Sequence, residues 1–239
     1  MMSNQTKKII KQLQNLGDAK IAAHSQRFFK TGKGQYGEGD LFLGIRVPVI
    51  RKCVRQYRAI SLEDTLELLR SPFHEARLLA LLILVAKYCS KKSSPAEQEA
   101  IYRAYLENTE FINNWDLVDS SAERIVGAHL FAQDREPIYG LVNSNSLWER
   151  RIGVMATFHF IKNGDFKDTL AIAQLLLDDQ EDLIHKASGW MLREVGNRDR
   201  KVEEGFLVAH YKKMPRTMLR YAIEKFPQSQ REAFLRGTK

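Results

Sequence analysis

The feature that most constrains the fold is a helical pattern that recurs along the chain at nearly constant spacing. Apolar helical segments carry a basic residue near their start at Arg77, Arg151, Lys186 and Arg220. The last three stand about 35 residues apart, and the first interval is about twice that length, with Trp115 near its midpoint. Such a period, with two helices in each unit, is typical of helical-repeat solenoids. We therefore predict stacked helical pairs, because one pair cannot bury its own apolar face. A single globular bundle is the alternative.

Local patterns predict helices and no β-sheet. Apolar residues recur at three- and four-residue intervals, and no segment alternates convincingly with period two. Helices are expected in particular over four segments: 74–88, 95–108, 168–179 and 215–226. Ser71 and Ser94 precede two of the prolines as predicted N-caps. All six prolines stand where a helix could begin: Pro48, Pro72, Pro95, Pro137, Pro215 and Pro227. The chain is therefore expected to be an all-α solenoid in one domain, 1–239.

Charge and cysteine usage limit the class of protein. The 239 residues carry a formal net charge of +8, which makes nucleic acid the first partner to consider and an anionic membrane surface the second. Cys53 and Cys89 belong to no CxxC motif, so we expect two reduced core thiols. The N-terminus lacks an apolar signal-peptide region, and the longest apolar run, 78–86, is shorter than the about 20 residues that span a bilayer. A cytoplasmic protein without a membrane partner is expected.

One glycine-rich segment, 30–45, interrupts the helical pattern. Its five glycines predict a mobile loop between the first helices and the following one. Gly32 and Lys33 are followed by Gly34, where a phosphate-binding Walker loop requires Ser or Thr. No strand is predicted before it either, so nucleotide binding is rejected. Backbone amides of this loop could still contact a nucleic-acid phosphate.

Chemistry-bearing residues gather in "NNWDLVDSSAERIV", residues 113–126. Asp116 falls in the first turn of a predicted helix, where a carboxylate suits the helix dipole. Asp119 lies one turn further among apolar residues and shares a helix face with Trp115, at positions i and i+4. The six histidines have no metal-ligand spacing, and no nucleophile elbow is present. We expect neither a metal nor a cofactor.

Arg151 and Trp190 stand at the matching register of the next two repeats. Because the inner helices of a solenoid line its concave surface, they are expected to form one patch with Trp115 and Asp119. Indole faces attract cations, a carboxylate stabilises a developing positive charge, and an arginine holds a phosphate. DNA that carries an alkylated purine fits such a patch. The alternative is a structural role: a core tryptophan pair, a capping aspartate and a surface arginine.

Four segments together resemble the AlkD-like DNA alkylation repair glycosylases. They are "FLGIRVP" (42–48), "NNWDLVDSSA" (113–122), "LWERRIGVM" (147–155) and "HKASGWMLREVG" (185–196), and the resemblance runs over roughly residues 5–230. It implies HEAT-like helical repeats with a concave basic groove that binds double-stranded DNA. It also implies excision of positively charged N3- and N7-alkylated purines, such as 3-methyladenine and 7-methylguanine, by hydrolysis of the N-glycosidic bond.

The resemblance also assigns roles to single residues. Asp119 falls on the catalytic carboxylate, which stabilises an oxocarbenium-like sugar and positions the attacking water. Trp115 and Trp190 fall on the tryptophans that flank the lesion, and Arg151 falls on the arginine that contacts a phosphate. Basic and aromatic residues around this patch complete the expected DNA-binding surface: Arg46, Arg51, Trp148, Arg150, Lys186, Arg193, Lys213 and Arg216.

The sequence departs from the family pattern at two places, and two other functions stay open. Asn114 stands where some members carry a second aromatic residue, and the glycine-rich loop is longer than in a minimal member. A non-catalytic binder of DNA structures and a protein-interaction solenoid are the alternative functions. The basic balance disfavours the second of these. No lysine is placed for Schiff-base chemistry, so a monofunctional enzyme is expected, and the polar C-terminal segment favours a monomer.

Overall fold

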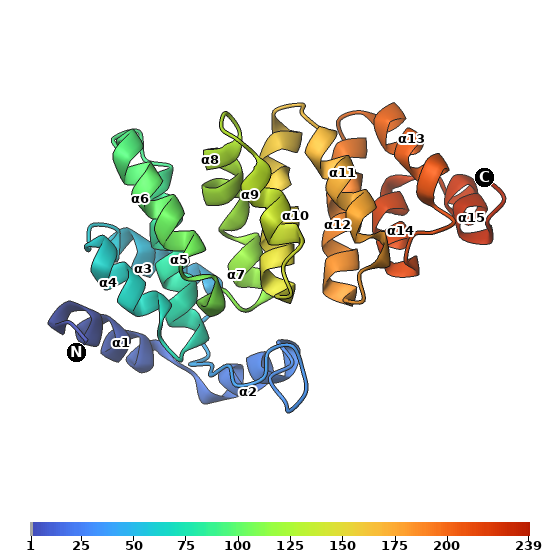
Figure 1. The fold of residues 1–239 in the computed structure, drawn as a ribbon. Helices are drawn as coiled ribbons and strands as arrows, with labels where there is room; N and C mark the ends of the chain where they lie inside the picture. Colours follow the sequence, from blue (N-terminus) through green and yellow to red (C-terminus); the bar gives the residue numbers. More distant parts are fainter. Residues whose placement is uncertain (1) are drawn as a thin grey trace. The chain divides into compact units, whose positions relative to one another are not determined.

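The computed structural model describes residues 2–239 and confirms the all-α helical-repeat prediction (Figure 1). Over this range the β-structure consists of an isolated parallel bridge between Leu41 and Phe73. The chain divides into two compact units, unit 1 (Met1–Ile125) and unit 2 (Val126–Lys239). The single domain expected over 1–239 stays a prediction. Within the described residues, no helix is long and apolar enough to cross a membrane.

Unit 1 is built around one buried helix, α5. Its residues Leu79, Leu81 and Leu84 are fully buried, and the helix packs against α3 and α4. Truncating one such leucine to alanine would cost about 2–5 kcal/mol. The elements of unit 1 are α1 (Asn4–Leu16), α2 (Ala19–Phe28), α3 (Val47–Tyr57), α4 (Leu62–Leu69), α5 (His74–Tyr88), α6 (Pro95–Leu106), the 3₁₀ turn η1 (Thr109–Phe111) and α7 (Trp115–Asp119).

Unit 2 stacks three helices side by side, with α12 between α10 and the shorter α14 (Figure 1). A π-helical turn, η2 (Glu123–Gly127), connects it to α7 along the chain. The second helices of the predicted pairs begin at His74, Trp115, Leu147, Asp182 and Arg216, roughly 35 residues apart. The elements of unit 2 are α8 (Ala128–Leu130), α9 (Glu136–Val142), α10 (Leu147–Lys162), α11 (Lys167–Leu175), η3 (Leu176–Asp178), α12 (Asp182–Gly196), α13 (Arg200–His210), α14 (Arg216–Ala222), η4 (Ile223–Lys225) and α15 (Gln228–Arg236).

The predicted helix starts are correct at α6 and shifted at α5. Ser94 caps α6 in a complete capping box with Glu97. Ser71 was expected to cap α5, but Phe73 is its N-cap, and the Ser71 hydroxyl accepts a hydrogen bond from the Phe73 amide instead. The helix starts later because the chain first pairs Phe73 with Leu41.

The two cysteines differ in their surroundings. Cys53 is a buried core thiol, as predicted, but Cys89 is exposed, so the expectation of a second core thiol is wrong. Cys89 is the C-cap of α5, where the chain leaves the buried helix. Cys89 therefore lies beyond the buried residues of α5 and is not covered by the core.

Candidate active site

The short helix α7 carries two of the four candidate catalytic residues, Trp115 and Asp119, and confirms that these two share one helix. Asn114 is its N-cap, and the Asn114 side-chain oxygen accepts a hydrogen bond from the Trp115 amide at 2.9 Å. The helix ends after Asp119, where the Ser120 and Ser121 hydroxyls donate to the carbonyl of Leu117. Such serine-to-backbone bonds compete with helix continuation. Trp115 and Asp119 are therefore the first and last residues of a five-residue helix.

Trp115 belongs to an aromatic cluster at the surface of unit 1, made with Phe28 and Phe29. Its ring stacks on Phe29 with centroids 5.3 Å apart and planes 17° from parallel, and it meets the edge of Phe28 at 6.0 Å. Phe28 is 58% exposed, which is unusual for a phenylalanine and leaves an aromatic edge available to a ligand. Sequence reasoning missed both phenylalanines, although the adjacent pair at the end of a helix was a visible signal.

Asp119 lies half-buried beside a buried tyrosine. Tyr105 is fully buried and shares a hydrogen bond with the Ser121 hydroxyl at 3.0 Å. Burial raises the pKa of the Tyr105 phenol, and the negative charge of Asp119 raises it further. The phenol therefore stays neutral beside the Asp119 carboxylate.

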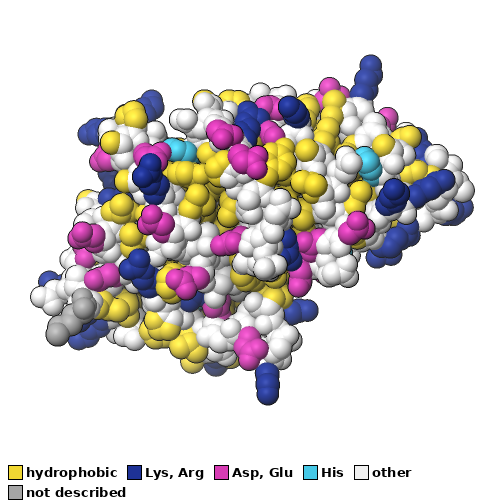
Figure 2. Space-filling view, in the orientation of Figure 1, with side chains coloured by type: hydrophobic (Ala, Val, Ile, Leu, Met, Phe, Trp, Pro, Cys, Tyr) yellow, Lys and Arg dark blue, Asp and Glu magenta, His cyan; other side chains and the backbone are white. Residues whose placement is uncertain are grey.

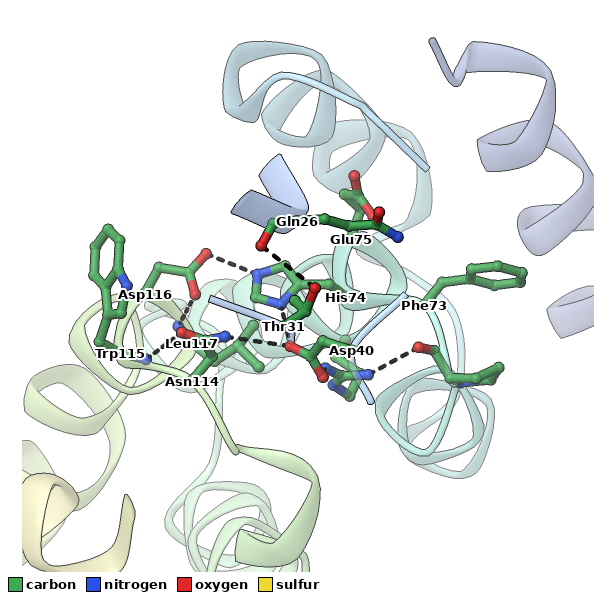
Figure 3. A network of polar contacts seen from close by, with 12 residues as sticks. Gln26, Thr31, Asp40, Phe73, His74, Glu75, Asn114, Trp115, Asp116 and Leu117 are labelled. Carbon is green, nitrogen blue, oxygen red and sulfur yellow. Dashed lines mark hydrogen bonds and ion pairs between the residues drawn. The ribbon is translucent and has the colours of Figure 1, made fainter. Parts of the chain in front are cut away.

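Beneath the first turn of α7, His74 lies between two carboxylates (Figure 3). Its Nδ1 stands 3.1 Å from an oxygen of Asp40, and its Nε2 stands 2.9 Å from an oxygen of Asp116. Burial alone lowers the pKa of His74, but the hydrogen bonds to Asp116 and Asp40 outweigh it and raise the pKa to about 9. Since both ring nitrogens face acceptors, the imidazole donates twice and is positively charged at neutral pH.

Asp40 collects three donors from elements far apart in sequence. Besides His74, the guanidinium of Arg77 donates at 2.5 Å and the amide of Asn114 donates at 3.2 Å. Burial raises the pKa of Asp40, but the His74 hydrogen bond and the Arg77 charge outweigh it and lower the pKa overall. With the half-buried Asp116, these groups bring two positive and two negative charges together.

The role expected for Asp116 was too simple. It was interpreted as an ordinary first-turn acid, and one of its oxygens does accept a hydrogen bond from the Leu117 amide. Its other oxygen accepts from His74 of α5 (Figure 3). No local pattern indicates this contact, because the two residues lie 42 positions apart in the chain.

The glycine-rich segment is anchored at its C-terminal end, and the mobility expected over 30–45 stays a prediction. The buried carboxylate of Glu75 accepts hydrogen bonds from the amides of Leu43, Gly44 and Ile45, at 2.9, 2.7 and 3.1 Å. Gly44 has a φ of +82°, and a Cβ there would lie 2.0 Å from the carbonyl oxygen of Asp18. Only glycine fits this position, so the segment is held against α5 by its backbone.

Arg151 and Trp190, the other predicted site residues, lie in unit 2 on α10 and α12. Arg151 is buried, and its guanidinium donates to the Leu183 carbonyl at 2.6 Å. Trp190 is half-buried, donates from Nε1 to Glu194 at 3.2 Å, and lies 6.0 Å from the ring of Phe158. The structure brings Trp115 and Asp119 together within unit 1. The convergence of all four residues on one patch stays a prediction.

The predicted DNA contacts on unpaired surface cations are Arg46, Arg51, Lys213 and Arg216. All four are exposed, although Arg216 also donates to the Leu235 carbonyl at 2.9 Å. Figure 2 shows Lys and Arg gathered over the C-terminal helices of unit 2 on the face drawn, with both signs of charge interspersed elsewhere. These cations are free to neutralise phosphates without breaking an ion pair first.

Three other predicted DNA contacts are already paired with carboxylates in unit 2. Arg150 bonds to Asp179 at 2.7 Å, Lys186 to Asp182 at 2.7 Å, and Arg193 forms an ion pair with a glutamate of η4. Trp148, also predicted to contact DNA, is half-buried on α10. A phosphate would have to exchange with these carboxylates, so each pair would contribute less to binding than a free cation.

Two other kinds of site are not found at α7. Over residues 2–239, no group of three or more histidine, cysteine or acidic side chains is arranged to hold a metal ion. A surface cavity of about 600 Å³ lies in unit 1, but it is lined by residues of α4, α5 and α6 and of their connections, such as Leu62, Lys91 and Ile101, and by no residue of α7. This cavity is therefore separate from the candidate site on α7.

Residues 9–226 match the family model described as "DNA alkylation repair enzyme". Among solved structures, the chain is similar to one described as "Predicted DNA alkylation repair enzyme from Enterococcus faecalis", with a TM-score of 0.66 and 14% sequence identity. The match covers 89% of this chain and 97% of that one. At this identity, the likeness establishes the fold. No curated protein sequence matches the chain significantly.

Proposed function

Because the chain belongs to the DNA alkylation repair enzyme family, and so has a role in the repair of alkylated DNA, we propose that it is a monofunctional DNA glycosylase. Its proposed substrates are N3- and N7-alkylated purines in duplex DNA. The observation that carries this proposal is the placement of Trp115 and a half-buried Asp119 on the single short helix α7. A carboxylate and an indole on one helix face suit a substrate that becomes positively charged at its sugar.

The chemistry follows from the charge of the substrate. An N3- or N7-alkylated purine is already cationic, so it leaves with the electron pair of the glycosidic bond and becomes neutral. The deoxyribose is left as an oxocarbenium-like cation, which the Asp119 carboxylate stabilises. A water held by the same carboxylate attacks C1′ and releases its proton. The products are a free alkylpurine, an abasic deoxyribose and one proton.

Other groups are proposed to hold the DNA. The indole of Trp115, backed by Phe29 at 5.3 Å, contacts the deoxyribose of the lesion nucleotide. Trp190 does the same, and Arg151 contacts a phosphate, as the resemblance implies. As the resemblance also implies, the damaged base is not enclosed in a tight protein pocket. This differs from the base-flipping glycosylases that seal the base in a cavity.

The deciding experiment measures release of 7-methylguanine from methylated duplex DNA under single-turnover conditions. Asp119→Asn keeps the shape of the side chain and removes its charge. We expect the excision rate to fall about 100- to 1,000-fold, the usual loss for one electrostatic stabiliser of a transition state. Duplex binding, followed by fluorescence anisotropy, should change little.

Glu110→Gln is the matched control, because Glu110 is an exposed acid on the adjacent turn η1 and its loss changes the net charge equally. It should excise at the wild-type rate. A wild-type protein that binds duplex DNA but releases no alkylpurine would refute the enzyme and leave the non-catalytic DNA binder. A protein that does not bind DNA would leave the protein-interaction solenoid.

Three further properties belong to the proposal. The enzyme is monofunctional, so borohydride should trap no covalent complex with DNA. It acts as a monomer, which sedimentation at several protein concentrations tests. It works in the cytoplasm and associates with the nucleoid when bound to DNA. Nothing in the proposed mechanism requires a cofactor.

A further inference from the structure

We propose that the buried network of Asp40, His74, Arg77 and Asp116 sets the orientation of α7, so that His74 is a positioning residue for Trp115 and Asp119. The inference rests on the proposed function for its catalytic meaning. Whether His74 fixes the position of the Trp115 ring can be tested even if the protein has no glycosylase activity.

The network joins three segments of unit 1 that lie far apart in sequence. His74 begins α5, Asp40 belongs to the glycine-rich segment, and Asp116 is the second residue of α7 (Figure 3). Asn114, the fully buried N-cap of α7, adds a second link by donating to Asp40 at 3.2 Å. Both residues that flank Trp115 in sequence are therefore bonded to the network.

α7 needs external support because it is short. Its five residues form little more than one turn before the chain passes through Ser120 and Ser121 into the π-helical turn η2. A helix of this length gains little stability from its own hydrogen bonds, so tertiary contacts contribute to its orientation. At its N-terminal end, Asp116 is bonded directly to His74, and Asn114 donates to Asp40, which is also bonded to His74.

A second path runs from His74 to Trp115 through aromatic rings. The His74 imidazole stacks on Phe42, with centroids 4.4 Å apart, and lies 5.0 Å from the ring of Phe29. Phe29 in turn stacks on Trp115 at 5.3 Å. A change in the His74 ring therefore reaches Trp115 from the backbone side, through Asp116, and from the ring side, through Phe29.

The positive charge of His74 allows its imidazole to donate to Asp40 and Asp116 at the same time. A neutral imidazole has one donor and one acceptor nitrogen, so one of the two carboxylates would face a lone pair. The charged groups facing His74 come from every packed element: Asp40 from the glycine-rich segment, Asp116 from α7 and Arg77 from α5 itself. The neighbouring Glu75 is occupied by the backbone amides of 43–45. Loss of the proton should release Asp40 or Asp116, and α7 with it.

The test combines fluorine NMR of the fluorotryptophan-labelled protein with excision kinetics. Three tryptophan resonances are expected, and Trp115→Phe assigns one of them. In His74→Gln the Trp115 resonance should shift or broaden, while those of Trp148 and Trp190 stay in place. The single-turnover rate constant should fall at least about tenfold, since small misplacement of a reacting group has effects of this size or larger. The dissociation constant for duplex DNA should change less than about threefold.

The pH dependence gives a readout that a merely structural role would not move. In wild type the Trp115 resonance should titrate at alkaline pH, and the excision rate should fall over the same range. In His74→Gln both alkaline transitions should be absent. His210→Gln is the matched control, because it changes a histidine of unit 2. It should leave the resonances of Trp115 and the rate as in wild type.

Each outcome decides between the two proposals. An unchanged Trp115 resonance and rate in a folded His74→Gln protein overturn the positioning role. If that variant does not fold, Asp116→Asn removes the charge from the α7 side only and must alter the Trp115 resonance for the inference to stand. If wild type releases no alkylpurine, the glycosylase fails, and the resonance of Trp115 in His74→Gln still decides whether His74 positions this ring.

Discussion

Raising the pH through the pKa of His74 should weaken the protein by a predictable amount. In the unfolded chain the imidazole has its ordinary pKa of 6.5, and in the folded protein the pKa is about 9. Because the folded state holds the proton more tightly, this stabilisation is complete below about pH 6.5 and is lost as the pH rises through about 9. At ~1.4 kcal/mol per pH unit, the contribution is on the order of 3 kcal/mol. His74 is 2% exposed, so solvent screens it little.

The assay is urea unfolding followed by far-UV circular dichroism, at steps between about pH 6 and about pH 9.5. Wild type should lose about 3 kcal/mol more than His74→Gln over this window. Taking the difference is necessary because other groups also titrate there. Among them, Glu203 is common to both proteins, and its contribution cancels. Parallel curves for wild type and variant would mean that His74 does not carry the charge inferred from its two contacts.

Three further predictions concern other parts of the chain. Burial raises the pKa of Glu203 to about 8 and thereby destabilises the fold as the pH rises from about 4.5 through 8. Glu203→Gln should therefore raise the unfolding free energy at pH 7 by about 1–2 kcal/mol, measured in urea, and a lowered value would contradict this. Gly44→Ala should lower the unfolding free energy by at least about 2 kcal/mol, because alanine is strained at this φ and its Cβ would overlap the Asp18 carbonyl. Gly34→Ala, which has a similar φ and no atoms nearby, should lower it by only about 1 kcal/mol, and thermal unfolding measures both. Lys213→Ala should reduce the salt slope of duplex binding by about 0.9, and the ion-paired Lys186 should give a smaller change; equal slopes would show that the pairing in the free protein is irrelevant.

Local sequence patterns were sufficient to predict the helix α7, but they did not predict the residues that pack around it. The i, i+4 spacing of Trp115 and Asp119 needs only helix geometry, and the two residues do share α7. The N-cap at Ser94 was equally local and equally correct. The helix start at Ser71 was missed because the pairing of Phe73 with Leu41 delays α5, and this contact is not local.

The polar network shows why the remainder of the site was beyond the sequence. His74 reaches Asp40 over 34 positions and Asp116 over 42. A histidine in an apolar helix and an acid in a first helical turn each have ordinary explanations, so neither attracted attention alone. Phe28 likewise becomes a candidate site residue only because its ring contacts Trp115 in the folded chain.

The sequence by itself determined the helices, their recurrence at roughly 35 residues, and the identity of the acid and indole on α7, because these depend on periodicity and on side-chain chemistry at short range. Tertiary structure alone decided that Asp116 serves a buried histidine, that the glycine-rich segment is tied to Glu75, and that several predicted DNA-binding cations already have carboxylate partners. These contacts form between segments brought together by packing. Their energies depend on burial and on charge partners, which the linear order of residues does not specify.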